Sequence, residues 1–329
     1  MSHQPPPLRR RSLLLAAPAL LTAPTVHAQS AGWSPDRPLR MIVTYPPGGV
    51  TDLMGRLIAE ALGRELHQTV VVENRSGAGG NIGTQAAVQA EPDGYTLMLG
   101  TTAMFGVNPL IYASSGVDAL RDMQPLGLSG EVANVLSVMP RRMPATTVAE
   151  LVAAAKDKPL LYGSVGNGSS SHMSAALFMQ GFGIEATHVP YRGSSPLVAA
   201  MLSNEIDFAF DTTATSAAHV KSGAIRALAV TTANRASALP EVPTLKESGL
   251  PDYDMGIWFG AFGSRRMPAP VVARLKTAMQ AISTPEFEGR LRTIYVDPLK
   301  IPPTELDSYV TRSAQTWQTI ARSANLAVN

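Results

Sequence analysis

The chain has 329 residues, of which 45% are hydrophobic and 16% are charged, and it contains no cysteine. The absence of cysteine excludes disulfides, thiolate catalysis, cysteine-ligated metals and a lipid-anchored cysteine. The formal net charge of +2 includes three arginines at positions 9–11 and no acidic residue before position 29, so without that leader the charge is −1 and gives no sign of nucleic-acid binding.

The first 28 residues predict an export signal that is cleaved after Ala28. Its basic residues at 9–11 precede an apolar run at 13–21, and Val26 and Ala28 lie just before the cut. The general secretory route and the twin-arginine route both remain open. No apolar run of about 18 residues follows the leader. In a bacterium with two membranes, we therefore expect the mature protein to be free in the periplasm.

Two glycine-rich turns lie at the ends of the first two predicted strands. A strand at 39–45 leads into the turn 46–52 and an amphipathic helix, and a strand at 69–75 leads into the turn 76–83. A third strand is predicted at 95–100. Glycine lets backbone N–H groups approach an anion closely, so two such units in a row predict one anion-binding pocket.

Nucleotide binding is one alternative for these turns, and the sequence argues against it. Ile82 stands where the dinucleotide fingerprint requires its third glycine, and no Gly-Lys-Ser/Thr sequence follows any glycine. A second alternative remains open for either turn alone. A tight connection between a strand and a helix often needs glycine for its backbone conformation, without any ligand.

The alternation of strands and helices returns from about 147 to 232, which predicts a second α/β lobe. Strands are expected at 160–163, 186–190, 206–210 and 225–230. Each is followed by glycine, serine, threonine or aspartate. Ligands of open α/β sheets gather beyond the carboxyl ends of the strands, so the loops of both lobes should face one crevice.

Two segments, 131–139 and 253–262, are predicted to connect the lobes and to act as a hinge. We therefore expect lobe 1 to comprise residues 29–130 and 257–329, and lobe 2 to comprise residues 131–256. Helical patterns at 270–282 and 305–326 are expected to return to lobe 1.

A secreted α/β hydrolase that uses Ser169 or Ser170 with His172 is a competing hypothesis. No Gly-x-Ser-x-Gly elbow and no metal-ligand spacing occurs in the sequence. Residues at i and i+2 of a helix point to different faces, which argues against Ser170 with His172 as a nucleophile and base. For His172 and His188, a capping or core role is favoured over catalysis or metal binding.

Six motifs in sequence order resemble the Bug (TctC-like) family of extracytoplasmic solute receptors of tripartite tricarboxylate transporters. They lie at 45–52, 73–83, 92–97, 162–172, 189–193 and 242–244. The resemblance implies a two-lobed Venus-flytrap receptor of the periplasmic-binding-protein fold, with two mixed sheets flanked by helices. It implies a small carboxylate ligand, delivery to a pair of permease subunits, no cofactor and no chemistry on the ligand. A sensor kinase as partner is compatible with the same sequence.

The resemblance also implies a set of ligand-facing residues in both lobes. In lobe 1 these are Tyr45, Gly48, Gly49, Thr51 and Asp52 of the first loop, Ala78, Gly79 and Gly80 of the second, and Thr101 and Thr102. In lobe 2 they are Ser164, Gly166, Ser169, His172, Tyr191 and Asp211.

Two further expectations concern the character of the site. Met104 and Phe105 stand where smaller or polar residues are common in the family, and an apolar wall there would suit an aromatic or aliphatic acid better than citrate. The anion is expected to be held by N–H groups of the glycine loops at helix starts rather than by Arg75 or Arg192.

Overall fold

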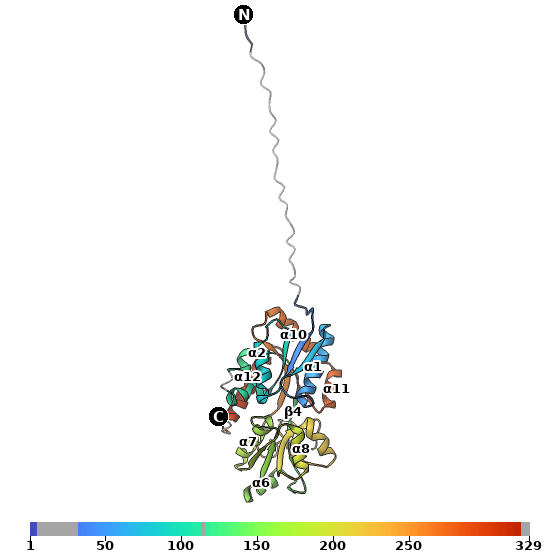
Figure 1. Cartoon of the computed structure of the whole chain (residues 1–329), viewed down its shortest axis with the longest axis vertical. Helices are drawn as coiled ribbons and strands as arrows, with labels where there is room; N and C mark the ends of the chain where they lie inside the picture. Colours follow the sequence, from blue (N-terminus) through green and yellow to red (C-terminus); the bar gives the residue numbers. More distant parts are fainter. Residues whose placement is uncertain (5–31, 113–115, 324–329) are drawn as a thin grey trace. The chain divides into compact units, whose positions relative to one another are not determined.

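The computed structural model describes residues 1–4, 32–112 and 116–323. The predicted leader from residue 5 onward, its cleavage point after Ala28 and the last residues of the predicted tail helix lie outside the described residues. The part of the chain from Gly32 onward forms one compact unit. This unit contains two sheets, each flanked by helices, which is the expected two-lobed α/β architecture (Figure 1).

Lobe 1 is built on a six-stranded sheet with the order β11-β4-β10-β3-β1-β2. The strands β1 (Leu39–Val43), β2 (Val70–Asn74) and β3 (Thr96–Thr101) are parallel, and β10 (Ile257–Ser264) joins β3 antiparallel. The strands β4 (Met123–Val132) and β11 (Asp297–Pro298) complete the sheet. The last three residues of β1, Met41, Ile42 and Val43, are fully buried, because helices cover both faces of a parallel region.

Helices from both ends of the chain cover this first sheet. The N-terminal ones are α1 (Val50–Leu66), the 3-10 turn η1 (Ala78–Gly80), α2 (Asn81–Gln89), α3 (Thr102–Gly106), α4 (Asn108–Ile111) and α5 (Ala119–Asp122). The tail supplies α10 (Ala269–Ala281), α11 (Pro285–Thr293) and α12 (Leu306–Ser323). The helix α10 packs on α1 and β4, and α12 packs on α3 and β4, so the tail returns to lobe 1 as expected.

Lobe 2 is built on a five-stranded sheet with the order β7-β6-β8-β5-β9. Its strands are β5 (Asn134–Val138), β6 (Leu161–Ser164), β7 (Thr187–Pro190), β8 (Phe208–Thr212) and β9 (Arg226–Val230). Its helices are α6 (Val148–Asp157), α7 (Ser170–Phe182), α8 (Ser194–Leu202) and α9 (Thr213–Lys221). The parallel strands β7, β6 and β8 end at one edge, which carries the candidate residues of this lobe.

The lobes are joined by two crossings that lie side by side. One runs from β4 to β5 through Ala133, and the other ends at Gly256 before β10. Thr231 bonds both crossings, since its Oγ1 accepts from Asn134 N at 2.8 Å and its carbonyl accepts from Met255 N at 2.8 Å. The hinge is therefore a double, hydrogen-bonded connection. The exact lobe boundaries stay a prediction.

Candidate ligand-binding site

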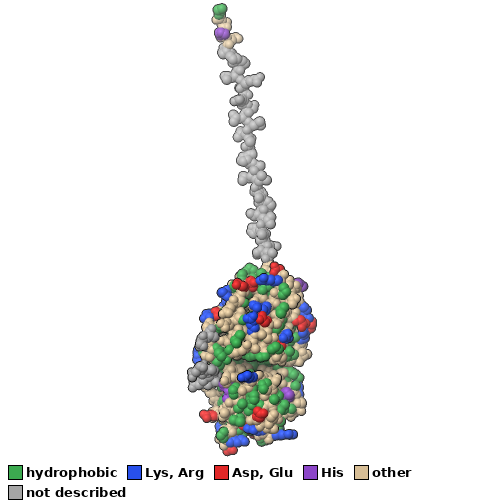
Figure 2. Space-filling view, in the orientation of Figure 1, with side chains coloured by type: hydrophobic (Ala, Val, Ile, Leu, Met, Phe, Trp, Pro, Cys, Tyr) green, Lys and Arg blue, Asp and Glu red, His purple; other side chains and the backbone are tan. Residues whose placement is uncertain are grey.

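The candidate residues gather at facing edges of the two sheets. Loops after β1, β2 and β3 form the edge of lobe 1, and loops after β6, β7 and β8 form the edge of lobe 2. The two edges meet where Gly168 lies against Ile111 of α4, so closely that a Cβ on Gly168 would overlap that side chain. Figure 2 shows a furrow across the waist between the lobes.

The first loop of lobe 1 is braced by Asp52, whose side chain is 4% exposed. Its Oδ2 accepts hydrogen bonds from Gly48 N and Arg56 Nε, both at 3.0 Å, and its Oδ1 accepts from Asn74 Nδ2 at 2.9 Å. Burial alone would raise the pKa of Asp52, but these hydrogen bonds and the Arg56 charge hold it below its ordinary value. Asp52 is therefore an ionised carboxylate that fixes the shape of the loop.

The N–H group of Gly48 was expected to hold an anion, but it donates its hydrogen bond to Asp52 instead. Gly49, by contrast, precedes α1 without any side-chain cap on that helix. Thr51, in the first turn of α1, is buried. The first N–H groups of a helix have no partner within the helix, so those at the start of α1 are available to an anion.

The second loop is held by left-handed glycines and by Tyr45. Gly79 and Gly80 have φ of 62° and 96°, and Ala78 has a φ of 47°. Gly80 N, the second N–H group expected to hold an anion, donates instead to Gly77 O at 3.0 Å. The carbonyl of Gly79 accepts from Tyr45 Oη at 3.2 Å and from Asn108 Nδ2 at 2.9 Å. Tyr45 thus joins both loops, and burial followed by the nearby Tyr112 raises its pKa to about 12.

Thr101, the last residue of β3, and Thr102, the first residue of α3, are turned into the protein. Thr102 is fully buried, and its Oγ1 accepts a hydrogen bond from Trp258 N at 3.0 Å. Thr101 is 3% exposed and pairs with Phe259 in the sheet. These threonines connect the third loop to the hinge strand β10.

The apolar wall expected from Met104 and Phe105 is not formed. Phe105 is fully buried and packs between Trp258 and Phe262, with ring centroids 5.5 and 4.4 Å away. Met104 is 1% exposed, and its sulfur lies 3.5 Å from Thr44 Oγ1. Both side chains point into the core because α3 packs against α12 and β10, so they give no preference for an aromatic or aliphatic acid.

In lobe 2, the loop between β6 and α7 is tied together by serine hydroxyls. Ser169 caps α7, since its Oγ accepts from His172 N at 3.3 Å and donates to Gly166 O at 2.6 Å. Ser164 is fully buried, and its Oγ lies 2.6 Å from His188 Nε2. The interaction between Ser169 and His172 runs through the backbone N–H of the histidine, so it is a helix cap and not a nucleophile and base pair.

Two neutral histidines are stacked beneath this loop. The rings of His172 and His188 lie 4.0 Å apart at 18°. Burial lowers the pKa of each to about 4, and His188 adds to the effect on His172. The Nδ1 of His172 accepts from Gly168 N at 3.1 Å, which places the proton of the neutral ring on Nε2. His188 was given only a structural role by sequence reasoning, and its place beside Ser164 arises from the pairing of β6 with β7.

Asp211, at the end of β8, has one carboxylate oxygen without a partner. Its Oδ1 accepts from Ser194 Oγ at 2.7 Å and from Thr212 N at 2.8 Å. Within the described residues its buried Oδ2 has no hydrogen bond, although Asp211 is only 2% exposed. Burial raises its pKa to about 6 despite the two donors, and no basic side chain contributes. A buried oxygen of this kind requires a proton or a donor, which a ligand or a water molecule can supply.

Tyr191, which follows β7, is half-buried, and its N–H donates to Ser164 O at 2.9 Å. This bond holds the start of the loop before α8 next to the serine network. The helix α8 begins after Gly193 without a side-chain cap. Lobe 2 therefore offers, at one edge, an uncapped helix start, the Asp211 carboxylate and the histidine pair.

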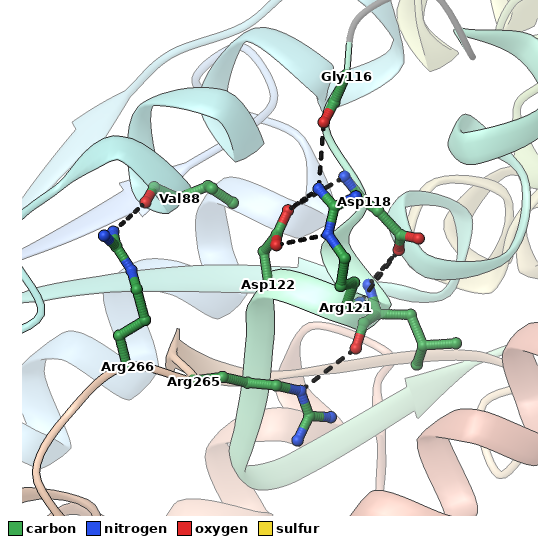
Figure 3. A network of polar contacts seen from close by, with 8 residues as sticks. Val88, Gly116, Asp118, Arg121, Asp122, Arg265 and Arg266 are labelled. Atoms are coloured by element: carbon green, nitrogen blue, oxygen red, sulfur yellow. Dashed lines mark hydrogen bonds and ion pairs between the residues drawn. The ribbon is translucent and has the colours of Figure 1, made fainter.

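A hollow of about 560 Å³ lies elsewhere on lobe 1, and its arginines have structural roles (Figure 3). Arg266 Nη2 donates to Val88 O at 3.0 Å, Arg265 Nε donates to Leu120 O at 3.3 Å, and Arg121 binds Asp122 with two bonds of 2.8 and 2.7 Å. These bonds connect α2, α5 and the end of β10. That end of β10 is opposite the hinge crossings, so this hollow is separate from the candidate site.

Within residues 1–4, 32–112 and 116–323, no group of three or more histidine, aspartate or glutamate side chains could hold a metal ion. Over the same described residues, no helix has the length and apolar character needed to cross a membrane.

Two lobes with mixed sheets and two adjacent crossings define the class of periplasmic binding proteins. Comparison with known proteins identifies the family within that class. Residues 54–326 match the family described as the tripartite tricarboxylate transporter family receptor, TctC. The chain belongs to this family, whose members are solute-binding receptors and not enzymes.

Curated relatives and solved structures agree with this assignment. The chain is 32% identical to a UPF0065 protein of Pseudomonas sp. strain P51, over 97% of this chain and 96% of the relative, and 30% identical to BugT of Bordetella pertussis, over 92% and 94%. An R. palustris protein solved with adipate is 34% identical, with a TM-score of 0.81 over 89% of this chain and 99% of the other. MatC of Rhodopseudomonas palustris, with bound malate, is 26% identical, with a TM-score of 0.76 over 87% and 99%.

Proposed function

We propose that this chain is a periplasmic receptor that captures a small organic acid between its lobes and delivers it to the permease subunits of a tripartite tricarboxylate transporter. The observation that carries the proposal is the uncapped start of α1, a 17-residue helix at the carboxyl end of β1. A helix start of this kind favours a carboxylate through its free N–H groups and its dipole. The adipate and malate bound by the two R. palustris neighbours support the same ligand class.

The ligand contacts that we propose come from both lobes. In lobe 1 they are the N–H groups of Gly49 and Gly79 and the first turn of α1, with Asp52 and Tyr45 fixing the loops from behind. In lobe 2 they are Asp211 Oδ2, His172 and the start of α8. The remaining predicted residues, Gly48, Thr51, Ala78, Gly80, Thr101, Thr102, Ser164, Gly166, Ser169 and Tyr191, shape the same two edges.

The unpartnered oxygen of Asp211 restricts which chemical group of the ligand can lie next to it. An ionised second carboxylate placed against it would be repelled, whereas a hydroxyl, amine or protonated acid would complete its hydrogen bonds. The end of the ligand in lobe 2 should therefore carry a donor. A sensor kinase as an additional partner stays a prediction.

A thermal-shift screen of the refolded, ligand-free protein tests the proposal. The panel contains mono- and dicarboxylates, hydroxy acids, amino acids, aromatic acids and nicotinate, and the amides or methyl esters of the same acids are the matched controls. Binding to the native state at a hundredfold excess over Kd adds roughly 2.7 kcal/mol to the apparent stability. We expect a shift with at least one acid and none with its uncharged control.

Two results would contradict the proposal. One is a panel in which the uncharged controls bind as well as the acids. The other is turnover of an ester or amide panel that is lost in Ser169→Ala, which would support the hydrolase instead. Delivery to a permease is tested separately, by uptake of the identified acid in cells with and without the receptor gene.

A further inference from the structure

A short segment of lobe 1 fastens onto lobe 2 beside the hinge. We call residues 295–298, which include β11, the strap. Thr213 Oγ1 of α9 donates to the carbonyl of Tyr295 at 3.2 Å, and the ring of Tyr295 packs against the buried cluster around Val135 and Val230 of lobe 2. Lys221 Nζ lies 4.8 Å from the centre of the same ring. The strap thus contacts lobe 2 through both its backbone and its side chains.

Asp297 of the strap also forms hydrogen bonds with lobe 2. Its Oδ2 accepts from Ser237 N at 3.3 Å, and its Oδ1 accepts from Ser237 Oγ. Ser237 follows β9 in the segment that leads to the second crossing, next to Ala236 and Ala238 of the same buried cluster. Rotation of one lobe against the other would have to break or displace these bonds.

Glu131 lies where the strap and both crossings meet. It is near the end of β4, and the pairing of β11 with β4 places it opposite Asp297. Its carboxylate rests against Gly256 of the second crossing, so that a Cβ there would overlap Oε1. Asp254, two residues before Gly256, accepts from Ala233 N at 3.0 Å. Asp297 on the paired strand and Asp254 on the second crossing therefore both act on the charge of Glu131 at the hinge.

Among the residues that the structure describes, no cation contributes to the pKa shift of Glu131. The groups facing Glu131 are Asp254 on the second crossing, Asp297 on the strap and Tyr309 on α12, and Arg312 of α12 acts on Tyr309. Burial, followed by the charges of Asp254 and Asp297, raises the pKa of Glu131 to about 7. The pKa of Tyr309 is raised by burial and by the same carboxylates, so Tyr309 stays neutral.

We propose that Glu131 is a proton switch for the two lobes: its protonated form keeps the strap fastened to lobe 2, and its ionisation loosens the strap and favours separation of the lobes. Ionisation adds a negative charge beside Asp254 and Asp297. The repulsion is relieved when Asp254 moves away with lobe 2, when the strap shifts away from β4, and when water reaches the carboxylate. Ligand affinity, which requires closure, is then higher at acid pH.

The direction of the pH effect and its pH range follow from the pKa of Glu131 in the fastened state and in the separated state. In the fastened state the pKa is about 7, and with the carboxylate in water it returns toward 4.5. The fastened state binds more protons between these values, so its advantage is complete below 4.5, falls as the pH rises and is lost above about 7. One proton changes the ratio of the two states by at most about tenfold per pH unit.

The test uses the ligand-free protein, so its outcome does not depend on the identity of the ligand. Because the chain has no cysteine, Pro47→Cys in lobe 1 and Ser195→Cys in lobe 2 provide two unique sites for spin labels. Both positions are exposed, Pro47 on the first loop of lobe 1 and Ser195 in the first turn of α8. We expect the distance distribution measured by electron–electron resonance to move to longer values between pH 4.5 and 8.

Two variants decide whether Glu131 is responsible. Glu131→Gln should keep the low-pH distribution at every pH, while Glu241→Gln, an exposed control in lobe 2, should behave as the parent. Asp297→Asn removes one of the repelling charges and should move the midpoint to lower pH. Folding of each variant is checked by circular dichroism. A parent distribution that does not change with pH, or a change that persists in Glu131→Gln, would overturn the proposal.

Discussion

Asp52 in lobe 1 and Asp211 in lobe 2 are similarly buried carboxylates whose pKa values are shifted in opposite directions. They are 3% and 2% exposed, and each lies beside a loop at the facing edges of the sheets. Asp52 accepts three hydrogen bonds, one of them from a charged arginine, and its pKa is held below the ordinary value. Asp211 accepts two bonds on one oxygen only, and its pKa rises to about 6.

The difference shows that burial alone does not identify a ligand contact. Desolvation acts on both carboxylates in the same direction, and the number of donors decides which state is stable. Asp52 is satisfied by the protein and therefore stabilises a loop. Asp211 keeps one oxygen unsatisfied, and this is typical of a site that is completed by a ligand.

The largest expected effect is on stability. Asp52→Ala removes three hydrogen bonds to a charged group, worth roughly 1.5 kcal/mol each, so the free energy of unfolding should fall by about 4 kcal/mol. Asp211→Ala in the ligand-free protein should lower it by less than about 1 kcal/mol, because removal of an unsatisfied oxygen offsets the loss of two bonds. Urea denaturation measures both. Equal losses would contradict the contrast.

The pH dependence of stability should differ in sign between the two residues. The raised pKa of Asp211 contributes stability that is complete below its unfolded value of 3.8 and is lost as the pH rises through about 6. The lowered pKa of Asp52 contributes stability that is present above 3.8 and is lost as the pH falls. The Asp211 effect is at most about 3 kcal/mol.

Asp211→Asn isolates this effect without removing the side chain. The parent should be more stable relative to Asp211→Asn at pH 4 than at pH 7, when both are measured free of ligand by denaturation. Asp157→Asn, at an exposed position, is the control for the loss of one negative charge. Asp207→Asn is unsuitable as a control, because Arg142 binds Asp207 at 2.9 Å. A difference that is constant with pH would show that Asp211 titrates normally.

The second loop should be sensitive to any side chain at Gly79. A Cβ there would lie 3.2 Å from Asn108 Oδ1 and from Tyr112 Cε2, and the φ of 62° disfavours branched residues. Gly79→Val should weaken binding of the identified acid by about 100-fold, equivalent to roughly 2.7 kcal/mol. Gly289→Val, on the exposed side of α11 with nothing within 4 Å, is the control for a general effect on folding.

Much of this site could be predicted from the sequence because its loops follow strands that are evident as buried runs. The glycines after β1 and β2 indicate the edge of lobe 1, and the family motifs predict the ligand-facing residues of lobe 2, which stay a prediction. The partners of these residues could not be predicted. The bond between Asp52 and Asn74 joins the first turn of α1 to the end of β2, and the contact of Ser164 with His188 depends on the register of β6 and β7.

The orientation of side chains in short helices was also beyond the sequence. Met104 and Phe105 lie in α3, which has five residues, too few for a periodic pattern to identify its buried face. Their burial follows from the return of α12 and from β10, which are more than 100 residues away in the chain. For Gly48 and Gly80 the reason is local. Their N–H groups bond to Asp52 and Gly77, four and three residues away, because of the exact loop conformation, which the sequence pattern does not specify.

The smallest effect is expected at Arg192. This residue is exposed in the loop before α8, and Arg75, the other nearby arginine, binds Glu73 at 2.5 Å. If backbone N–H groups at helix starts hold the acid, Arg192→Ala should change its affinity by about twofold or less, similar to the exposed control Lys246→Ala. A charge paired directly with the ligand would instead be worth on the order of 2 to 5 kcal/mol. Calorimetry on both variants, with folding checked by circular dichroism, distinguishes these values. A loss of tenfold or more in Arg192→Ala alone would mean that an arginine, and not the glycine loops, holds the carboxylate.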